Sequence, residues 1–271
     1  MLDGGPLLIA HRGGSALAPE NTMPAFRVAV ERWEADMIEL DVRASADGRC
    51  IVLHDATVDR TTNGTGAAAG MRYDELRELD AGYRFTPDGG KTYPYRGLAA
   101  SIPTIEEVLE TLPRVRLTVE VKTGAAQRPL FAAIERFGAT ARVIAAGMYA
   151  KDRSLFPGYE GAISASREQL VPFVLFHYLR LARLAPFAAD VVQVPERQGS
   201  YRLVTPRFIR DLHARGVHVH LWTVNDEADM DRLLDWGVDG LVTDRPDLLG
   251  RVLQRRFGRA LAPGHRGRGL N

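Results

Sequence analysis

The chain has 271 residues, a formal net charge of +1 and one cysteine. This length suits one large domain, such as an α/β barrel of about 250 residues, or two small domains. The charge argues against a nucleic-acid-binding stripe, and a single cysteine excludes an internal disulfide framework. The first residues lack the features of a signal peptide. The sequence contains no apolar run of about 18 residues, so we expect no transmembrane span. We therefore expect a cytosolic protein.

The first predicted strand is the apolar run at residues 7–11. It delivers His11 and Arg12 to a glycine-rich turn. A helix over residues 23–34 follows, because polar residues that favour helix N-caps stand directly before an apolar periodic stretch.

Alternating apolar and polar residues over 37–43 predict a second strand. Side chains two positions apart share a face of a strand, so Glu39 and Asp41 point the same way. Two neighbouring carboxylates repel each other, and a divalent cation relieves that repulsion. The Asp47-Gly48 pair predicts a hairpin turn that returns the chain and brings His54 near the two carboxylates.

After a long irregular connection at 56–103, predicted strands and helices alternate to the end of the chain. The helices are expected at 105–112, 129–137, 168–184, 206–215, 227–236 and from 246 onward. Eight predicted strands end at His11, Asp41, Lys122, Ala146, Ser164, Val194, Thr223 and Thr243. Alternating strands and helices predict parallel βαβ units, and eight such units predict a closed barrel.

Chemically active side chains gather at the predicted strand ends, which is where such barrels carry their active sites. These residues are His11, Arg12, Glu39, Asp41, Glu120, Lys122, Gln193 and Trp222. Glu39, Asp41 and Glu120 form an all-oxygen donor set, which suits Mg²⁺ or Ca²⁺ better than zinc. Arg12 and Lys122 beside such a cation suit an anionic substrate.

His11 and His54 are candidates for a general acid and a general base. Taken alone, each histidine is better explained as a hydrogen-bonded structural residue, and Trp222 as core packing. The set as a whole favours a catalytic site over these separate structural explanations.

The chain resembles the glycerophosphodiester phosphodiesterase family over nearly its whole length. The resemblance is carried by His11-Arg12-Gly13, Pro19-Glu20-Asn21-Thr22, Glu39-Leu40-Asp41, Leu53-His54-Asp55, Arg60-Thr61-Thr62-Asn63-Gly64, Glu120-Val121-Lys122, Trp222-Thr223-Val224-Asn225, Asp239-Gly240 and Asp244-Arg245-Pro246. It implies a TIM (β/α)8 barrel with an insertion after the second strand. It also implies hydrolysis of small-molecule glycerophosphodiesters to glycerol 3-phosphate and an alcohol.

Carried over by position, the resemblance implies that Glu39, Asp41 and Glu120 bind one divalent cation, Mg²⁺ or Ca²⁺. His11 and His54 would be the acid–base pair, and Arg12 and Lys122 would hold the phosphate. Trp222 and Gln193 are candidates for the substrate pocket, although Gln193 matches the family pattern less firmly.

In the mechanism that we expect, the cation lowers the pKa of a glycerol hydroxyl. One histidine removes the hydroxyl proton and the other protonates the departing alcohol. The pattern leaves open which histidine does which. It also leaves open whether a cyclic glycerol phosphate forms or water attacks directly.

Two other functions stay open. One is a lysophospholipase D activity, or a related phospholipase activity, on the same barrel. The apolar run at 173–179 suggests this alternative, which would involve peripheral contact with lipid. The other is a catalytically silent barrel that binds a ligand. For organisation, we expect one domain over 1–257, with the insertion at 56–103 within it, and a flexible basic tail over 258–271.

Overall fold

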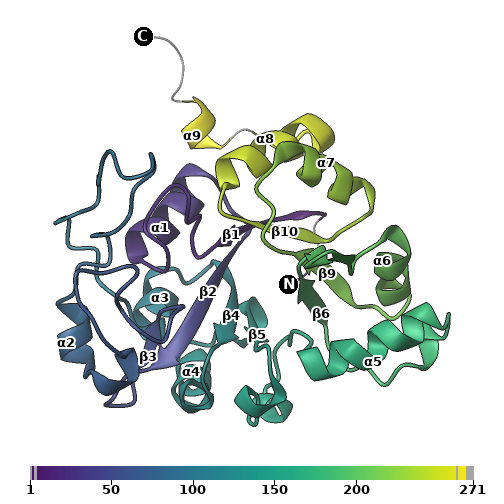
Figure 1. The fold of residues 1–271 in the computed structure, drawn as a ribbon, viewed down its shortest axis with the longest axis horizontal. Coiled ribbons are helices and arrows are strands. Elements are labelled where there is room, and N and C mark those ends of the chain that lie inside the picture. The colour runs from purple at the N-terminus through teal and green to yellow at the C-terminus, as the bar shows by residue number, and fades with distance from the viewer. Residues whose placement is uncertain (1, 3–4, 261, 267–271) are drawn as a thin grey trace.

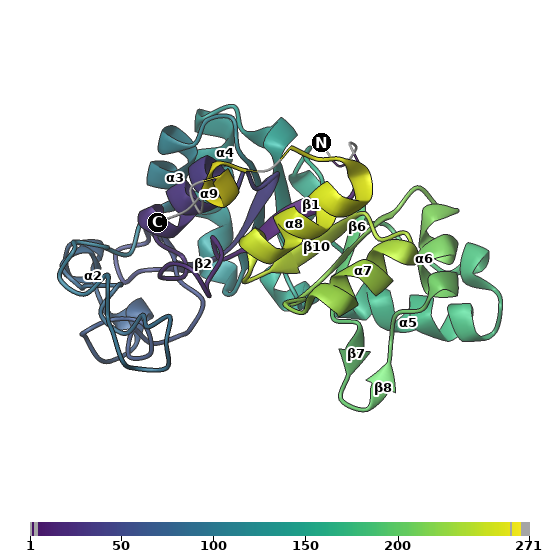
Figure 2. The same ribbon diagram turned by 90° about the horizontal axis from the view of Figure 1, so that it is seen from above.

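The computed structural model describes residues 2, 5–260 and 262–266, and it shows a ring of parallel strands surrounded by helices (Figures 1 and 2). Seven strands of the ring are β1 (Leu7–His11), β2 (Met37–Ala44), β4 (Arg116–Val121), β5 (Val143–Ala146), β6 (Val191–Val194), β9 (His218–Leu221) and β10 (Gly240–Thr243). They pair side by side in the order β5-β4-β2-β1-β10-β9-β6. The first and last strands of this order, β5 and β6, are joined by the eighth segment.

The eighth segment lies at Ile163 and Ser164, where the chain makes two isolated parallel bridges. Ile163 bridges to Ala145 of β5, and Ser164 bridges to Val191 of β6. The backbone N–H of Ser164 donates to the Ala145 carbonyl at 3.0 Å. These bridges close the ring, so the predicted eight-stranded barrel is confirmed.

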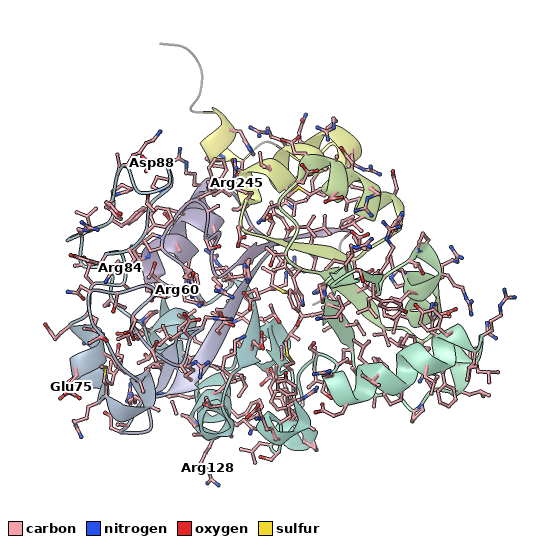
Figure 3. The ribbon with its side chains drawn as sticks, viewed as in Figure 1. Arg60, Glu75, Arg84, Asp88, Arg128 and Arg245 are labelled. Atoms are coloured by element: carbon pink, nitrogen blue, oxygen red, sulfur yellow. The ribbon has the colours of Figure 1, made fainter. Side chains whose placement is uncertain are left out.

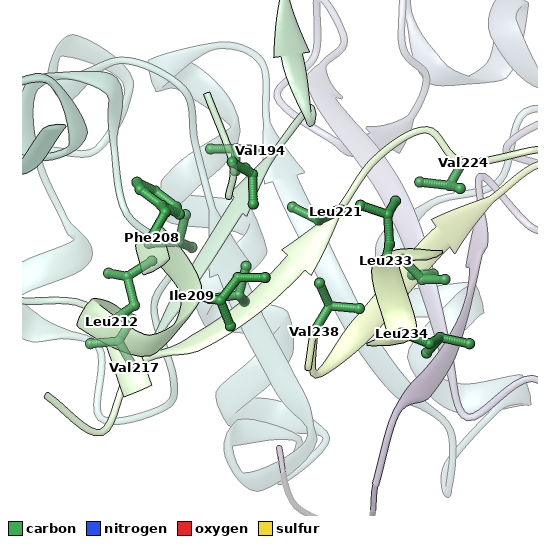
Figure 4. Packing of buried hydrophobic residues seen from close by; sticks show 14 of the residues in the cluster. Val194, Phe208, Ile209, Leu212, Val217, Leu221, Val224, Leu233, Leu234 and Val238 are labelled. Carbon is green, nitrogen blue, oxygen red and sulfur yellow. The ribbon is translucent and has the colours of Figure 1, made fainter. Parts of the chain in front are cut away.

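Apolar and polar residues alternate in β2 and β4, whereas β1, β5 and β10 are nearly continuous apolar runs that are buried on both faces. Ile38 and Leu40 of β2 point outward and are fully buried against the surrounding helices. On the other side of the barrel, Val194 and Leu221 are buried in one hydrophobic cluster that also contains Phe208 of α6 (Figure 4). The alternate residues of each strand point into the barrel.

Several of the helices that cover the ring begin at a polar N-cap residue, as expected from the sequence. Thr104, for example, accepts from the backbone N–H of Glu107, whose side chain bonds back to the backbone of Thr104. The covering helices are α1 (Met23–Arg27) with its π-helical continuation η1 (Val28–Arg32), α3 (Ile105–Thr111), α4 (Gln127–Arg136), α5 (Arg167–Tyr178), α6 (Pro206–His213), α7 (Glu227–Asp235) and α8 (Pro246–Phe257). Among the described residues, no helix is both long and apolar enough to cross a membrane.

The helix expected over 168–184 is shorter than its apolar pattern predicts. The helix α5 ends at Tyr178, and Arg180 has a left-handed backbone with φ of 61°. A short 3₁₀ helix, η7 (Ala182–Leu184), follows this turn.

The insertion after β2 has its own small core beside the barrel (Figure 1). The strand β3 (Cys50–Val52) pairs antiparallel with β2 through the turn at Asp47-Gly48, as predicted. Beyond it, the stretch at 56–103 is not wholly irregular, because it forms η2 (Ala68–Gly70) and α2 (Tyr73–Arg77). Leu76 of α2 is fully buried against the end of β3.

The remaining short elements lie in loops around the ring. They are η3 (Gly124–Ala126), η4 (Thr140–Arg142), η5 (Ala150–Asp152), η6 (Phe156–Gly158), the hairpin strands β7 (Arg197–Gln198) and β8 (Tyr201–Arg202), and α9 (Pro263–Arg266).

The described part of the C-terminal segment is packed against the barrel, which differs from the flexible tail expected from its composition. Arg259 lies 2.6 Å from a carboxylate oxygen of Asp36, in the loop before β2. Farther along, His265 donates from Nε2 to the carbonyl of Asp247 at 2.7 Å and makes an edge-to-face ring contact with Trp33. Residues 267–271 of the expected tail lie outside the described residues.

Candidate active site

The pairing register of three neighbouring strands brings the predicted site residues together. His11 at the end of β1 pairs with Glu39 of β2. Two residues farther along β2, Asp41 pairs with Glu120 of β4. Residues paired across parallel strands lie side by side, and all four side chains point to the inner, carboxyl-end rim of the barrel.

Three carboxylates converge at this rim. Glu39, Asp41 and Glu120 each offer one oxygen, and these oxygens all lie within 4.8 Å of one another. Burial, together with the neighbouring charge of Asp41, raises the pKa of Glu39 to about 8. Ionisation of all three carboxylates together is therefore unfavourable in this buried cluster.

Two cations contact Asp41, which is only 1% exposed. Lys122 Nζ lies 3.0 Å from Asp41 Oδ1 and 2.9 Å from Glu120 Oε2. Arg12 Nε lies 3.3 Å from Asp41 Oδ2, which also accepts a 2.9 Å hydrogen bond from Asn21 Nδ2. Burial alone raises the pKa of Asp41, but Lys122 and Arg12 outweigh it and the net shift is downward. Asp41 is therefore the ionised centre of the cluster.

His11 is held by an aspartate at the end of β10. Its Nδ1 lies 2.6 Å from Asp244 Oδ1, and its Nε2 lies 3.9 Å from Glu39 Oε2. Asp244 also accepts from the Ser15 hydroxyl and, at 2.7 Å, from Asn225 Nδ2. Burial lowers the pKa of His11. The bond to Asp244 and the charge of Glu39 raise it by more than burial lowers it, so the net shift is upward.

His54 has a similar partner within the insertion. Its Nδ1 lies 2.6 Å from Asp55 Oδ1, and Arg60 Nε donates to the other oxygen of Asp55 at 2.5 Å. Arg60, labelled in Figure 3, also donates to Glu20, which in turn accepts from Arg12 at 2.8 Å. Burial raises the pKa of Asp55, but the bonds from Arg60 and His54 bring it down to about 2. A chain of ion pairs thus links His54 through Asp55, Arg60 and Glu20 to Arg12 at the end of β1.

The two pocket candidates occupy different depths. Trp222 follows β9 at the rim and is 36% exposed. Gln193 lies inside the barrel, where its Oε1 accepts from Thr118 Oγ1 at 3.1 Å and its Nε2 lies 3.4 Å from His220 Nδ1. The polar atoms of Gln193 are therefore engaged by its neighbours in the barrel.

Several residues of the site carried no predicted role. They are Ser15, Glu20, Asn21, Arg43, Asp55, Arg60, Asn225 and Asp244. Most of them stand in motifs that signalled the family, and Asp55 is adjacent to His54 in the chain. Arg43 shares a face of β2 with Asp41, and its Nε donates to the His54 carbonyl at 2.9 Å. Strand periodicity would have found Arg43, but the partners of Asp244 depend on contacts between distant parts of the chain.

Comparison with known proteins decides the family. The model of the glycerophosphoryl diester phosphodiesterase family matches residues 11–248. The chain belongs to this family. A glycerophosphodiester phosphodiesterase from Caldanaerobacter subterraneus subsp. tengcongensis is 33% identical, over 92% of this chain and 98% of the relative. One from Bacillus subtilis is also 33% identical, over 91% of this chain and 86% of the relative. The predicted resemblance is therefore confirmed, and the chain is a member of an enzyme family.

Solved structures of the glycerophosphoryl diester phosphodiesterase family share the fold. A phosphodiesterase domain from Mycobacterium tuberculosis has a TM-score of 0.79 and 22% identity, covering 93% of this chain and all (100%) of that chain. A phosphodiesterase from Oleispira antarctica, solved in complex with the product sn-glycerol-3-phosphate, has a TM-score of 0.74 and 24% identity, covering 92% and 97%. These likenesses agree with the closed barrel described above.

Proposed function

We propose that this chain hydrolyses glycerophosphodiesters to glycerol 3-phosphate and an alcohol. The observation that carries the proposal is one rim that combines three converging carboxylates with two histidines, each bonded to an aspartate. The relatives that are named as glycerophosphodiester phosphodiesterases support the choice of substrate class.

The carboxylate cluster fits a divalent cation. Glu39, Asp41 and Glu120 present only oxygen, within a 4.8 Å span and without a thiol or imidazole among them, which suits Mg²⁺ or Ca²⁺. Lys122 and Arg12 supply two positive charges to the three carboxylates, and burial together with the charge of Asp41 raises the pKa of Glu39, so a further cation would favour its ionised form. When bound, the cation would supply positive charge that favours ionisation of a hydroxyl and offsets the charge that develops on phosphate.

Arg12 and Lys122 bind the substrate phosphate in this proposal. Both are cationic groups that already face the carboxylate cluster, with side chains about one-sixth exposed (16% and 15%). The planar guanidinium of Arg12 suits two phosphate oxygens at once, whereas Lys122 acts as a point charge. Trp222, exposed at the rim, forms one wall of the pocket, and Gln193 lies below it.

His11 and His54 transfer protons at the glycerol hydroxyl and at the oxygen of the leaving alcohol. An ionised carboxylate only accepts hydrogen bonds, so Asp244 and Asp55 hold the proton on Nδ1 of each neutral ring. The Nε2 atom of each histidine is then left to accept or donate a proton. Asp244 and Asp55 are thus positioning residues.

The direct test is turnover of glycerophosphocholine after removal of metal. We expect no activity in excess EDTA, recovery with Mg²⁺ or Ca²⁺, and unchanged circular dichroism, because the carboxylates need the cation for catalysis rather than for folding. Glu39→Gln and Asp41→Asn should each raise the metal concentration that gives half-maximal activity. Full activity in excess chelator would refute the metal assignment, and absence of turnover under every metal condition would refute the activity.

The apolar run at 173–179, which suggested a lysophospholipase D, has both phenylalanines turned toward the barrel, where they offer no groove for an acyl chain. Phe173 is fully buried and packs against Phe187 and Phe208, with ring centroids 5.2 Å and 5.6 Å away. Phe176 packs against the same cluster. These two rings belong to the packing between α5, α6 and the barrel, so we favour the small-substrate activity.

A further inference from the structure

The helix α5 and the turn after it expose a row of large apolar side chains. Val171, Leu175, Tyr178 and Leu179 are 59%, 58%, 52% and 60% exposed, and Leu184 in η7 is 69% exposed. The first four follow the i, i+4, i+7, i+8 spacing of a single helix face. Single exposed apolar residues are ordinary on protein surfaces, but a row of this kind marks a contact surface.

The exposed row is not needed to hold the helix on the barrel. The opposite face of α5 does that, through the buried side chains of Phe173 and His177. His177 Nδ1 lies 2.6 Å from Asp211 of α6, which ties the helix to its neighbour. The helix is therefore apolar on both faces. Among the described residues, one face packs against the barrel, and the other is exposed apart from the contact of Tyr178 with Tyr201.

The charged side chains within the row and directly after it are basic, whereas Glu168 lies one turn before it on α5. Residues 169–189 contain no aspartate or glutamate, and they include Arg180 and Arg183. Both arginines are exposed, and the described part of the structure shows no ion pair for either of them. An apolar row next to unpaired arginines complements a partner surface that has an apolar interior and anionic groups at its edge.

The surface also reaches toward the catalytic rim. The hydroxyl of Tyr178 contacts that of Tyr201 in the β7–β8 hairpin, which follows β6 at the carboxyl end of the barrel. Figure 2 shows this hairpin projecting from the barrel beside α5. Exposed Trp222 follows the neighbouring strand β9 at the same end.

We propose that this face docks on an anionic phospholipid bilayer. We define the α5 face as Val171, Leu175, Tyr178, Leu179, Arg180, Arg183 and Leu184. Its leucine and valine side chains enter the boundary between headgroups and acyl chains, while the tyrosine stays at headgroup level. Arg180 and Arg183 extend their guanidinium groups to lipid phosphates.

A second copy of the chain suits this surface less well than a lipid does. In a two-fold symmetric dimer the same patch faces itself, which brings the arginines of both copies into one interface. The α5 face carries no carboxylate to pair with them. An anionic bilayer can contact both the apolar side chains and the arginines of the α5 face at the same time.

The proposal concerns binding and does not depend on the proposed phosphodiesterase activity. The assay is flotation of the full chain with vesicles of phosphatidylcholine alone, or of equal parts phosphatidylcholine and phosphatidylglycerol. We expect flotation with the anionic vesicles and little with the neutral ones. Leu175→Ser/Leu179→Ser and Arg180→Glu/Arg183→Glu should each lower the bound fraction by about tenfold.

A matched control is Arg128→Glu/Arg136→Glu on α4, because both arginines are exposed and Arg128 lies at the outer edge of the molecule (Figure 3). This pair should leave flotation unchanged. Circular dichroism and turnover of soluble glycerophosphocholine equal to wild type show that the α5 variants remain folded. Failure of the wild type to float with anionic vesicles at low salt overturns the proposal. The proposal is also overturned if neither α5 variant weakens flotation. It is overturned as well if the wild type is a dimer and Leu175→Ser/Leu179→Ser dissociates that dimer.

Discussion

The two histidines differ in what neutralises their aspartates. Asp55, beside His54, receives a guanidinium from Arg60. Among the described residues, the other side chains that donate to Asp244, beside His11, are neutral: the Ser15 hydroxyl and the Asn225 amide. Because no guanidinium competes there for the carboxylate charge, we expect Asp244 to matter more in the proposed mechanism than Asp55 does.

Removing either histidine should abolish most of the activity while leaving the fold intact. His11→Ala and His54→Ala each remove a proton-transfer group, and we expect each to lower kcat by about 10²- to 10⁴-fold. The measurement is kcat for glycerophosphocholine at saturating metal, with circular dichroism and Tm alongside. A variant that keeps more than roughly a tenth of the wild-type rate excludes its histidine from the acid–base pair.

Asp244→Asn should lower kcat more than it changes KM. The amide keeps the size of the side chain but presents no charge to stabilise and orient His11, so we expect about a 10- to 10³-fold loss in kcat. A control is Asp239→Asn, because Asp239 pairs with His213 at 2.7 Å outside the proposed site. That variant should alter Tm and leave kcat near wild type. Equal kinetic effects of the two substitutions would show that Asp244 has no special role.

Local spacing accounts for those parts of the site that lie on one strand or one hairpin. Glu39 and Asp41 follow from period-two alternation, and His54 follows from the turn at Asp47-Gly48. The bond between His11 and Asp244 joins residues at opposite ends of the chain, because β1 pairs with β10. No local pattern contains that pairing, so the role of Asp244 required the closed barrel.

At the scale of elements, β9 places an unusual group inside the barrel. His220 is fully buried, and burial lowers its pKa to about 4. Its Nδ1 lies 3.4 Å from Gln193 Nε2, and Gln193 in turn accepts from Thr118. This polar ladder across the interior is stable only while the imidazole is neutral.

The buried histidine should make the protein less stable in mild acid. Between pH 7 and 5 the unfolded chain takes up a proton at His220, with a pKa near 6.5, whereas the folded chain does not, so the free energy of unfolding falls with pH. The contribution is about 2 kcal/mol over this interval. His220→Asn keeps a polar atom near the Nδ1 position but cannot take up this proton. In denaturant titrations, its free energy of unfolding should therefore fall by about 2 kcal/mol less than that of the wild type between pH 7 and 5. The same pH dependence in both proteins would contradict the prediction.

The alternation of strands and helices was predictable because turn residues flank the strands and polar capping residues, such as Thr104 before α3, precede several of the helices. Element lengths were less predictable, as α5 shows. Its apolar pattern continues past Tyr178, but the left-handed backbone at Arg180 ends the helix, and nothing in the pattern marks that turn. Tertiary packing of Ala182 and Ala185, which are both buried, sets the path there.

At the scale of the whole molecule, the segment after α8 ties the chain end to the region before β2. Arg259 donates to both oxygens of Asp36, at 2.6 and 3.2 Å, and Asp36 also accepts from the backbone of Leu8 at 2.8 Å. Composition alone predicted a flexible tail, because an arginine in a glycine-rich segment gives no sign of its partner. One two-pronged ion pair therefore joins the last part of the chain to the first two strands.

Arg259→Ala should lower the free energy of unfolding by about 1–2 kcal/mol, because it leaves a partly buried aspartate without its cation. A suitable comparison is Arg251→Ala, which removes a more exposed ion pair with Glu227 at 3.2 Å and should cost about 0.5 kcal/mol or less. Chemical denaturation of both variants provides the measurement. Equal losses would show that the Arg259 contact is an ordinary surface pair.

The way in which the ring closes has a consequence for its motions. The ladder between β2 and β4 pairs six residues, whereas a short segment around Ile163 and Ser164 joins β5 and β6 through isolated bridges and a few backbone hydrogen bonds. Fewer backbone hydrogen bonds must break for the strands to separate at this position, so local opening of the barrel should begin between β5 and β6. In deuterium exchange, the amides of Ser164 and Ala165 should then label earlier than those of β2 and β4, where the barrel carries its carboxylates.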